Sequence, residues 1–506
     1  MSQIAEAVQD SWEAPAENSD TRRDHDAALS ERVWIIAAGA MVVIQLWFGM
    51  IASSFWLDET GTWWMVKDGA AEAMRRSYSW TGGAPLFSII EWGASRLFGL
   101  NEIALRIPSV VAMCGAIWFL YRIAERLYDR ANAAVAAFVF LCVVSFYAID
   151  ARPYALAMLC LTASTWALLR WLDTNRPLDA ILSVITAALV VYAHCILSLG
   201  LVPGVVYAAV TLREQPRRLA WLGSVQVAVA LLCLPLVSEL RAFYAARSTH
   251  TFTAAPGVGD LFFALIPCSL AGVFVLLVWI FMTFRGEAGI AGKCSPSAAL
   301  LIGTWSLFAP LALFLLAVST DLRLYVPKYY SSALPGQALL VGGLLSSVRR
   351  GAVRKALIVV LAGVAILTYG RSATTSHGGE DWRGAMEFLK KEAGSAPVLL
   401  VSGFVEASDF AKLRDPELRD VLFAPELFYG EPEISIRLPN LFNGRGNEDL
   451  DNIAKQLQGE SRFFLLTENP DRSYEMWLLG RLGSGCRSET AGRGFGYIWI
   501  SRFTCE

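Results

Sequence analysis

An adjacent pair of carboxylates, Asp58 and Glu59, stands where a long apolar segment ends, within the stretch FWLDETGTWW (55–64). A carboxylate that lies beside a second, orienting acid can act as a general base toward a hydroxyl group. The same two acids could instead only end a membrane helix and cap the next one, with Trp63 and Trp64 in an aromatic belt at the membrane surface. The two residues alone leave both interpretations open.

A second polar cluster lies in AIDARPYAL (148–156), a short connection between two apolar segments that holds Asp150, Arg152 and Tyr154. Asp150 and Arg152 could simply pair with each other, or Asp150 could cap the following helix. An exposed ion pair contributes only about 0–1 kcal/mol, so stability is a weak reason to place one here. This cluster therefore favours a functional role for the acids near it.

A third cluster combines cations and hydroxyl groups in LRLYVPKYYSSALPG (322–336), which contains Arg323, Lys328 and Tyr329. Such a set suits a phosphate group, which lysine binds as a point charge. Ordinary anchoring of these side chains among lipid headgroups is the alternative.

The histidines and cysteines form no metal site that can be recognised from spacing, so we predict no metal ligand and no certain cofactor, and a divalent metal stays open. His194 lies between two apolar segments and is more typical of a packing residue, while the isolated His250 and His377 receive no role. Cys486 and Cys505 lie in a polar C-terminal segment and could form a disulfide or remain two thiols.

The composition predicts an integral membrane protein, because 55% of the 506 residues are hydrophobic and only 17% are charged, whereas soluble domains carry roughly 25% charged residues. Nothing in it suggests a nucleic-acid partner. A membrane helix needs about 20 mostly apolar residues, which gives about eleven segments. They are 33–55, 107–124, 133–149, 153–172, 179–193, 194–211, 219–238, 259–284, 298–318, 333–348 and 355–371.

Basic residues in the short connections set the expected orientation. Arg122, Arg126 and Arg130, and later Arg217 and Arg218, fall on the same side as the N-terminus. Because basic loops stay in the cytoplasm, we expect a cytoplasmic N-terminus, and an odd number of spans then places the C-terminus outside.

Three segments lie outside the spans. Residues 1–32 are polar and acidic and are expected to be a disordered cytoplasmic tail. Residues 56–106 form a large first outer loop, in which 84–99 is an interfacial helix. Residues 372–506 alternate between helix and strand patterns, such as the helix 381–394 and the strand 396–403. This alternation predicts a small extracytoplasmic α/β domain with a mainly parallel sheet.

The ordered set of motifs resembles a known family. The acid pair is followed by GGAPLFSIIEWGASRLFGLNEIALRIPS (82–109), DARPYAL (150–156) and YVPKYYSSALPG (325–336). Together they resemble polytopic membrane glycosyltransferases of the GT-C fold, in the bacterial branch related to protein O-mannosyltransferases and lipid A aminoarabinose transferase. The resemblance covers roughly residues 33–371.

The resemblance implies transfer of a hexose or pentose from a polyprenyl-phosphate donor, usually with inversion, to a lipid, glycan or protein acceptor at the outer face of the cytoplasmic membrane. Asp58 would be the general base, and Glu59 would orient the acceptor or the Asp58 loop. Asp150 and Arg152 would line the same cavity, with Tyr154 from the same motif. The donor phosphate would be held by Lys328 with Tyr329 and Arg323.

Two other classes of protein remain open from the sequence. A transporter or lipid flippase could have this many spans, although its charged residues would not be expected to gather at one face. Alternatively, the tail 372–506 could be a binding domain on a large membrane anchor, although one span would be enough for an anchor.

Overall fold

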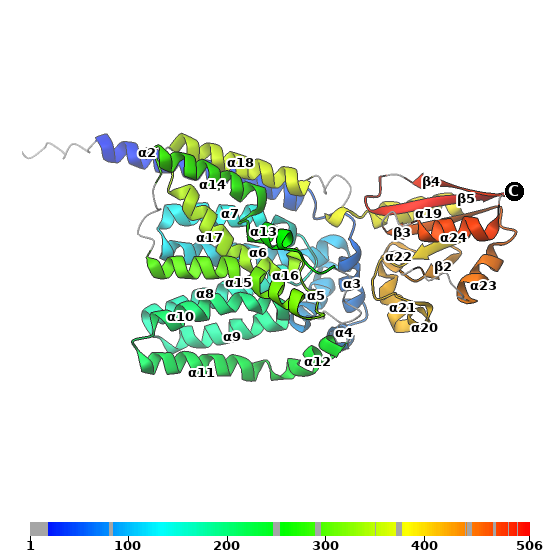
Figure 1. The fold of residues 1–506 in the computed structure, drawn as a ribbon, viewed down its shortest axis with the longest axis horizontal. Helices are drawn as coiled ribbons and strands as arrows, with labels where there is room; N and C mark the ends of the chain where they lie inside the picture. Colours follow the sequence, from blue (N-terminus) through cyan, green and yellow to red (C-terminus); the bar gives the residue numbers. More distant parts are fainter. Residues whose placement is uncertain are drawn as a thin grey trace, which may run out of the picture.

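The structure is a computed structural model, and it describes residues 19–79, 84–245, 254–288, 295–349, 351–370, 377–440, 442, 448–468, 472–483, 485–492 and 494–506. A body of long helices occupies one end, and a smaller unit of helices around a sheet caps the other end, where the C-terminus lies (Figure 1). The predicted fold class, a helical membrane body with a small C-terminal α/β unit, is confirmed. His250 lies outside the described residues.

The apolar segments predicted from the sequence all coincide with helices or with consecutive pairs of helices. In chain order these are α2 (Ser19–Val42) with η1 (Val43–Phe48), α6 (Glu102–Leu127), α7 (Arg130–Ala148), α8 (Tyr154–Thr174), α9 (Pro177–Ala193), η2 (Cys195–Leu201) with α10 (Val202–Thr211), α11 (Pro216–Leu232) with η3 (Leu234–Leu236) and α12 (Val237–Ala245), α13 (Val258–Leu265) with α14 (Ser269–Phe284), α15 (Pro296–Ser319), α17 (Leu334–Ser346), and α18 (Gly351–Gly370).

Fewer of these helices are long enough to cross a membrane unaided. Within the described residues, six helices have the length and apolar composition of a span, and the number is eight if each of two bent pairs counts as one. The helices 177–193 and 195–211 are shorter. The count of eleven spans therefore stays a prediction.

One expectation at the N-terminus is wrong in part. Helix α2 already begins at Ser19, so residues 19–32 are helical and not a disordered tail, because the apolar helix that follows extends back through them. Residues 1–18 lie outside the described part of the chain.

The segment predicted to be the first outer loop (56–106) contains short helices that lie between the helical body and the C-terminal unit. They are α3 (Leu57–Val66), α4 (Ala70–Ser79) and α5 (Pro85–Phe98). Helix α5 corresponds to the predicted interfacial helix. It begins at Pro85, which suits the first helical turn, and ends before Gly99, whose φ of 91° favours glycine.

The C-terminal unit holds one five-stranded sheet in the order β2-β1-β3-β5-β4. The strands are β1 (Val398–Val401), β2 (Ser435–Leu438), β3 (Arg462–Glu468), β4 (Cys486–Gly492) and β5 (Ile498–Cys505), and the helices are α19 (Trp382–Ala393), α20 (Phe410–Arg414), α21 (Pro416–Leu422), α22 (Ala424–Tyr429), α23 (Glu448–Leu457) and α24 (Ser473–Leu482).

The sheet is mixed, which corrects the prediction of a mainly parallel one. Strand β1 pairs in parallel with β2 and β3, whereas β5 pairs antiparallel with β3 and β4. Strand β4 was not predicted, and its short connection to β5 permits only an antiparallel pair. A disulfide joins Cys486 to Cys505, which are opposite each other in these two strands.

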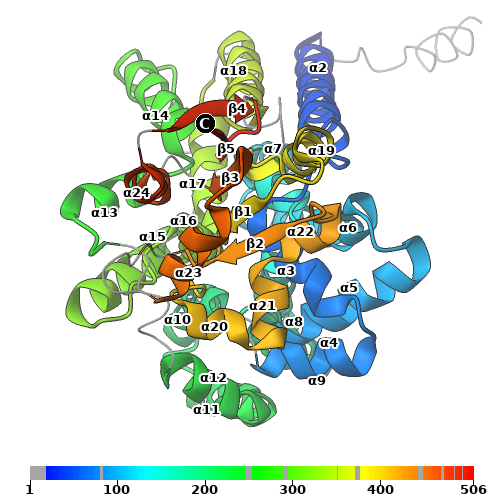
Figure 2. The same cartoon turned by 90° about the vertical axis from the view of Figure 1, so that its right-hand side faces the viewer.

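The core of the C-terminal unit continues into the first outer loop. Leu57 and Trp64 of α3 are buried in the same cluster as Trp382, Phe404 and Ile500 of the C-terminal unit. Viewed from its C-terminal end, the molecule shows the sheet in front of α3 (Figure 2). The start of α3, where the acid pair lies, is therefore held between the two parts of the molecule.

Candidate functional site

The structure brings the first and third polar clusters into direct contact. Asp58 lies in the first turn of α3, and Lys328 lies in the short helix α16 (Pro327–Tyr330). The ammonium group of Lys328 donates a hydrogen bond to Oδ2 of Asp58 at 2.8 Å. Residues 270 positions apart in the chain thus form an ion pair at the same end of the helical body.

Arg152 adds a second positive charge to this pair. Its Nη1 donates to the backbone carbonyl oxygen of Asp58 at 3.1 Å. Burial alone would raise the pKa of Asp58, but the charges of Lys328 and Arg152 outweigh burial and lower it. Burial would likewise lower the pKa of Lys328, but the charge of Asp58 raises it. Both groups are therefore charged near neutral pH.

Asp150 does not contact this pair directly but is linked to it through the side chain of Trp56. The indole Nε1 of Trp56 donates to Oδ1 of Asp150 at 3.1 Å. The face of the same indole lies 5.6 Å from the Lys328 ammonium, a distance at which a cation is attracted to the ring. Asp150 is fully buried, so it supports the Asp58–Lys328 pair from behind and does not face open solvent.

Glu59 has a different environment from its neighbour Asp58. It is fully buried with Arg106, whose Nε donates to Oε1 of Glu59 at 2.8 Å and whose Nη2 reaches Oε2. Glu59 also accepts the backbone N–H of Ala151 at 2.8 Å and that of Trp56 at 3.3 Å. Its carboxylate is fully engaged, so of its two predicted roles the geometry favours orienting the Asp58 loop.

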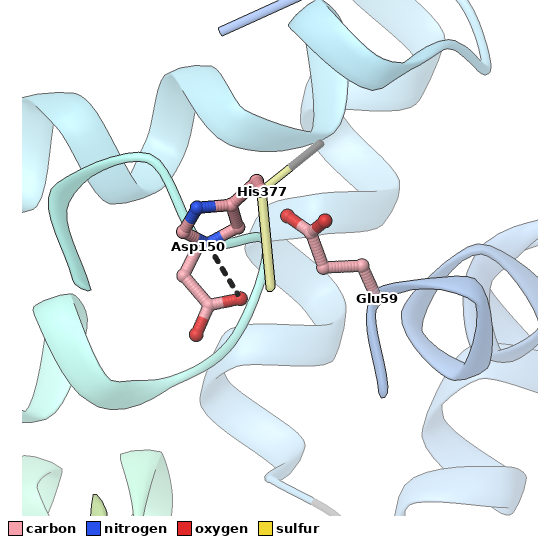
Figure 3. Close-up of side chains that lie close together, drawn as sticks. All are labelled: Glu59, Asp150 and His377. Carbon is pink, nitrogen blue, oxygen red and sulfur yellow. Dashed lines mark ion pairs between the residues drawn. The ribbon is translucent and has the colours of Figure 1, made fainter. Parts of the chain in front are cut away.

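Glu59 and Asp150 lie close to His377, which had received no role in the sequence analysis (Figure 3). Potential ligand atoms of the three side chains lie within 4.8 Å of one another. The Nε2 atom of His377 is 3.8 Å from Oδ1 of Asp150, and its ring packs 4.4 Å from that of Phe146.

This cluster does not fit a metal ion well. Both oxygens of Glu59 already accept hydrogen bonds from Arg106 and from the backbone. Within this cluster of described residues, the buried atoms without a hydrogen-bond partner are Oδ2 of Asp150 and the two ring nitrogens of His377. Two ligands are fewer than the three or four protein ligands of zinc sites. We therefore derive no step of a reaction through a metal here.

Aromatic side chains form the wall beside Lys328. The ring of His194 lies 5.2 Å from that of Tyr154 and 5.8 Å from that of Tyr329. The Lys328 ammonium lies 5.9 Å from the centre of the Tyr329 ring. The predicted residues Tyr154 and Tyr329 therefore meet at the site, and His194, expected only to pack, packs between them.

Arg323 contacts the end of α15, and its expected role at the donor phosphate stays a prediction. Its guanidinium donates to the carbonyl oxygens of Ala317 and Thr320 at the end of α15. The cations that act on Asp58 are Lys328 and Arg152. Arg323 thus caps a helix, because its position shortly after α15 brings it back to the carbonyl groups of the last turn.

The C-terminal unit contributes residues that the sequence analysis missed. Oε2 of Glu380 accepts the backbone N–H of Leu57 and the indole N–H of Trp382, both at 2.8 Å. Burial raises the pKa of Glu380, and burial together with the charge of Glu380 raises that of Glu468. Burial also raises the pKa of Glu406, with Asp58 among its charged neighbours.

An apolar cavity opens next to Lys328. It has a volume of about 350 Å³ and is lined mostly by apolar side chains of α7, α13, α14, α17 and α18. Pro327, Tyr330 and Ser331, the near neighbours of Lys328 in the chain, are among its lining residues. The charged pair and this apolar cavity are therefore separated by one turn of helix.

Comparisons with known proteins agree with this architecture. Residues 83–238 match the model of the family described as dolichyl-phosphate-mannose-protein mannosyltransferase. Among curated protein sequences, none matches significantly.

Solved structures match over nearly the whole chain. The crystal structure of ArnT from Cupriavidus metallidurans in the apo state has 12% sequence identity and a TM-score of 0.55, and the match covers 94% of this chain and 98% of that one. The structure of ArnT bound to undecaprenyl phosphate has 13% identity and a TM-score of 0.49, with coverage of 93% and 98%. The apo oligosaccharyltransferase of Archaeoglobus fulgidus has 11% identity and a TM-score of 0.49, with coverage of 90% and 71%.

At this identity, the match to apo ArnT establishes the fold. The resemblance seen in the sequence motifs is confirmed by the family match over residues 83–238 and by this shared fold: the chain is a multi-pass membrane protein with the GT-C fold.

Proposed function

We propose that this protein transfers a sugar from a polyprenyl-phosphate donor to an acceptor hydroxyl group, with inversion at the anomeric carbon and with Asp58 as the general base. The observation that carries the proposal is the contact between Asp58 and Lys328 at 2.8 Å. A base for the acceptor and a cation for the phosphate leaving group are the two groups that this reaction needs, and they lie side by side.

The surroundings of Lys328 support a lipid-linked donor. The apolar cavity of about 350 Å³ is lined by Pro327, Tyr330 and Ser331, which are neighbours of Lys328 in the chain. A prenyl chain in this cavity would bring its phosphate close to the segment that carries the Lys328 ammonium. An apolar cavity with a cation nearby matches an amphiphilic phosphate.

Donor binding would make Asp58 a stronger base. In the structure, Lys328 holds Asp58 as a stabilised anion, which makes it a weak base. A donor phosphate would compete for the Lys328 ammonium, and loss of that contact would raise the proton affinity of Asp58. The base would then become effective only when the donor is present.

The transfer step balances with these groups. The acceptor oxygen forms a bond to the anomeric carbon while the bond from that carbon to the phosphate oxygen breaks. The hydroxyl proton passes to Asp58, and the phosphate leaves as an anion beside Lys328. A nearby cation stabilises that charge as it develops, and Arg152 adds to the positive potential.

The orientation of the protein in the membrane is inferred from the positions of its basic residues. We place the N-terminus in the cytoplasm and the Asp58 site with the C-terminal unit at the extracytoplasmic face of the cytoplasmic membrane. Arg217 and Arg218 lie in the first turn of α11, and this helix begins at the end of the helical body away from the C-terminal unit, as the rule for basic loops requires.

The test separates binding from chemistry. The protein is purified in mild detergent, incubated with a panel of polyprenyl-phosphate sugars, and its bound lipids are identified by mass spectrometry; the sugar that binds is then used to measure transfer. We expect Asp58→Asn to keep the bound donor and to lose transfer by about 10²–10⁴-fold, and Lys328→Met to lose the bound donor.

Asp321→Asn is the matched control, because Asp321 is an exposed acid near the same segment, and it should behave like wild type. Full transfer by Asp58→Asn would remove Asp58 as the base. If no polyprenyl-phosphate sugar binds the wild type, the transferase proposal fails and transport across sealed vesicles becomes the next assay.

A further inference from the structure

An apolar groove follows the length of α11 on the helical body and shares no lining residue with the cavity beside Lys328. It runs between α9 and α11 and has a volume of about 800 Å³. Helix α11 begins at the end of the helical body away from the C-terminal unit and runs toward α12 (Figure 1). Apolar side chains of both helices line most of the groove, among them Pro177, Ile181, Ile185, Trp221, Ala228 and Leu232.

Arginine side chains line the end of this groove at which α11 begins. Arg217 and Arg218 stand in the first turn of α11, and Trp171 and Asn175 face them from the end of α8. Arg218 donates to the carbonyl oxygen of Leu172 at 2.8 Å, so part of its guanidinium is used to cap α8. Arg217 is exposed, and none of the ion pairs among the described residues includes it.

The acids nearest in the chain do not neutralise these arginines, because each already has its own partner. Asp173 pairs with Arg126, Asp179 with Arg170, and Glu214 with Arg213. The arginine end of the groove therefore carries surplus positive charge, and an occupant with a negative headgroup would complement it.

The length of the groove matches one leaflet of a bilayer. Arg218 and Leu232 are both in its lining, and their separation of fourteen positions in the chain corresponds to about 21 Å along a helix axis. Half of a hydrocarbon core of about 30 Å is about 15 Å. The groove can thus hold an acyl chain over the depth of a leaflet and still leave the headgroup at the level of the arginines.

We propose that an anionic phospholipid of the bilayer binds in this groove, with its phosphate at Arg217 and Arg218 and an acyl chain between α9 and α11. Basic pockets between membrane helices are known as sites for anionic lipid headgroups. The donor lipid is not the expected occupant, because its phosphate has to reach Lys328 at the other end of the helical body.

The lipid would complete the packing of α11. Within this helix, Leu222 and Val225 are the buried residues, and Trp221, Val227 and Leu231 are exposed. A helix with so little buried surface gains stability from an acyl chain that fills the space beside it. Loss of the lipid should therefore lower thermal stability.

The test uses the full chain in nanodiscs or detergent with defined lipids. Delipidated protein is titrated with phosphatidylglycerol or phosphatidylcholine, and bound lipid is counted by native mass spectrometry. We expect one phosphatidylglycerol to bind wild type at least tenfold more tightly than phosphatidylcholine, and to raise its melting temperature. Arg217→Glu should abolish this preference.

Two further variants distinguish the contribution of the lipid headgroup to binding from that of the acyl chain. Arg213→Glu is the matched control, since Arg213 pairs with Glu214 outside the groove lining, and it should keep the preference. Ala228→Trp fills the groove and should prevent binding of either lipid there. The proposal is overturned if Arg217→Glu binds phosphatidylglycerol like wild type.

Discussion

At the scale of single residues, Asp58 links the stability of the protein to its proposed chemistry. Lys328 and Arg152 outweigh the effect of burial and lower the pKa of Asp58. A carboxyl group whose pKa is lower in the folded state stabilises the fold above its unfolded pKa of about 3.9. That contribution is lost as the pH falls through the folded-state pKa.

Asp58→Asn should therefore remove a pH-dependent part of the stability. We expect the difference in melting temperature between wild type and this variant to be constant from about pH 5 to 7 and to shrink below about pH 4, because the Asp58 carboxyl group of the unfolded chain then binds a proton more readily than that of the folded protein. Thermal unfolding in detergent over this range checks the prediction. A difference that stays constant down to pH 3 would contradict it.

At the scale of elements, the start of α3 depends on a buried ion pair. Glu59 and Arg106 are both fully buried, and Arg106 also donates to the carbonyl oxygens of Ile51, Ser53 and Ser54. This one guanidinium therefore ties α6 to the segment that leads into α3. A charged residue within an apolar segment is a signal that could have identified Arg106 from the sequence.

Arg106→Met should be strongly destabilising, because it leaves the Glu59 carboxylate buried without its partner. The expected cost is about 3–5 kcal/mol, seen as a lower melting temperature and a lower yield of folded protein. The double variant Glu59→Leu, Arg106→Met should cost less than the sum of Glu59→Leu alone and Arg106→Met alone, since no uncompensated charge remains. Additive costs would show that the two residues act independently.

At the scale of the whole molecule, the C-terminal unit helps to hold α3 in place. Glu380 accepts the N–H of Leu57, the residue before Asp58, and Phe404 packs in the same core as Leu57 and Trp64. Arg383 donates to the carbonyl oxygen of Ala52 and pairs with Glu102. The unit is therefore docked on the segment that positions the base.

Glu380→Ala should loosen α3 without unfolding the rest of the chain. We expect faster hydrogen exchange in peptides covering 55–66, since the amide of Leu57 loses its acceptor. Glu380→Gln keeps a carbonyl oxygen at this position and should exchange nearly like wild type. The exposed Glu387 on α19 provides the control variant Glu387→Ala, and equal exchange in all four proteins would exclude this role for Glu380.

The amino-acid sequence alone determined the features that depend on local pattern. Apolar segments predict helices because the length and hydrophobicity needed for a membrane helix are properties of consecutive residues. The polar clusters around Asp58, Asp150 and Lys328 were expected together because connections between spans alternate between the two sides of the membrane. The disulfide pairing of Cys486 with Cys505 was left as one of two outcomes.

Only the tertiary structure decided which side chains meet. Glu380 contacts Leu57 across 323 positions of the chain, and His377 reaches Asp150 from a segment whose sequence has no distinctive pattern. Arg323 lies near Lys328 in sequence but caps α15. Periodicity and composition report the environment of each segment, whereas partners so distant in sequence are set by how the segments pack, because burial and hydrogen bonding act on neighbours in space.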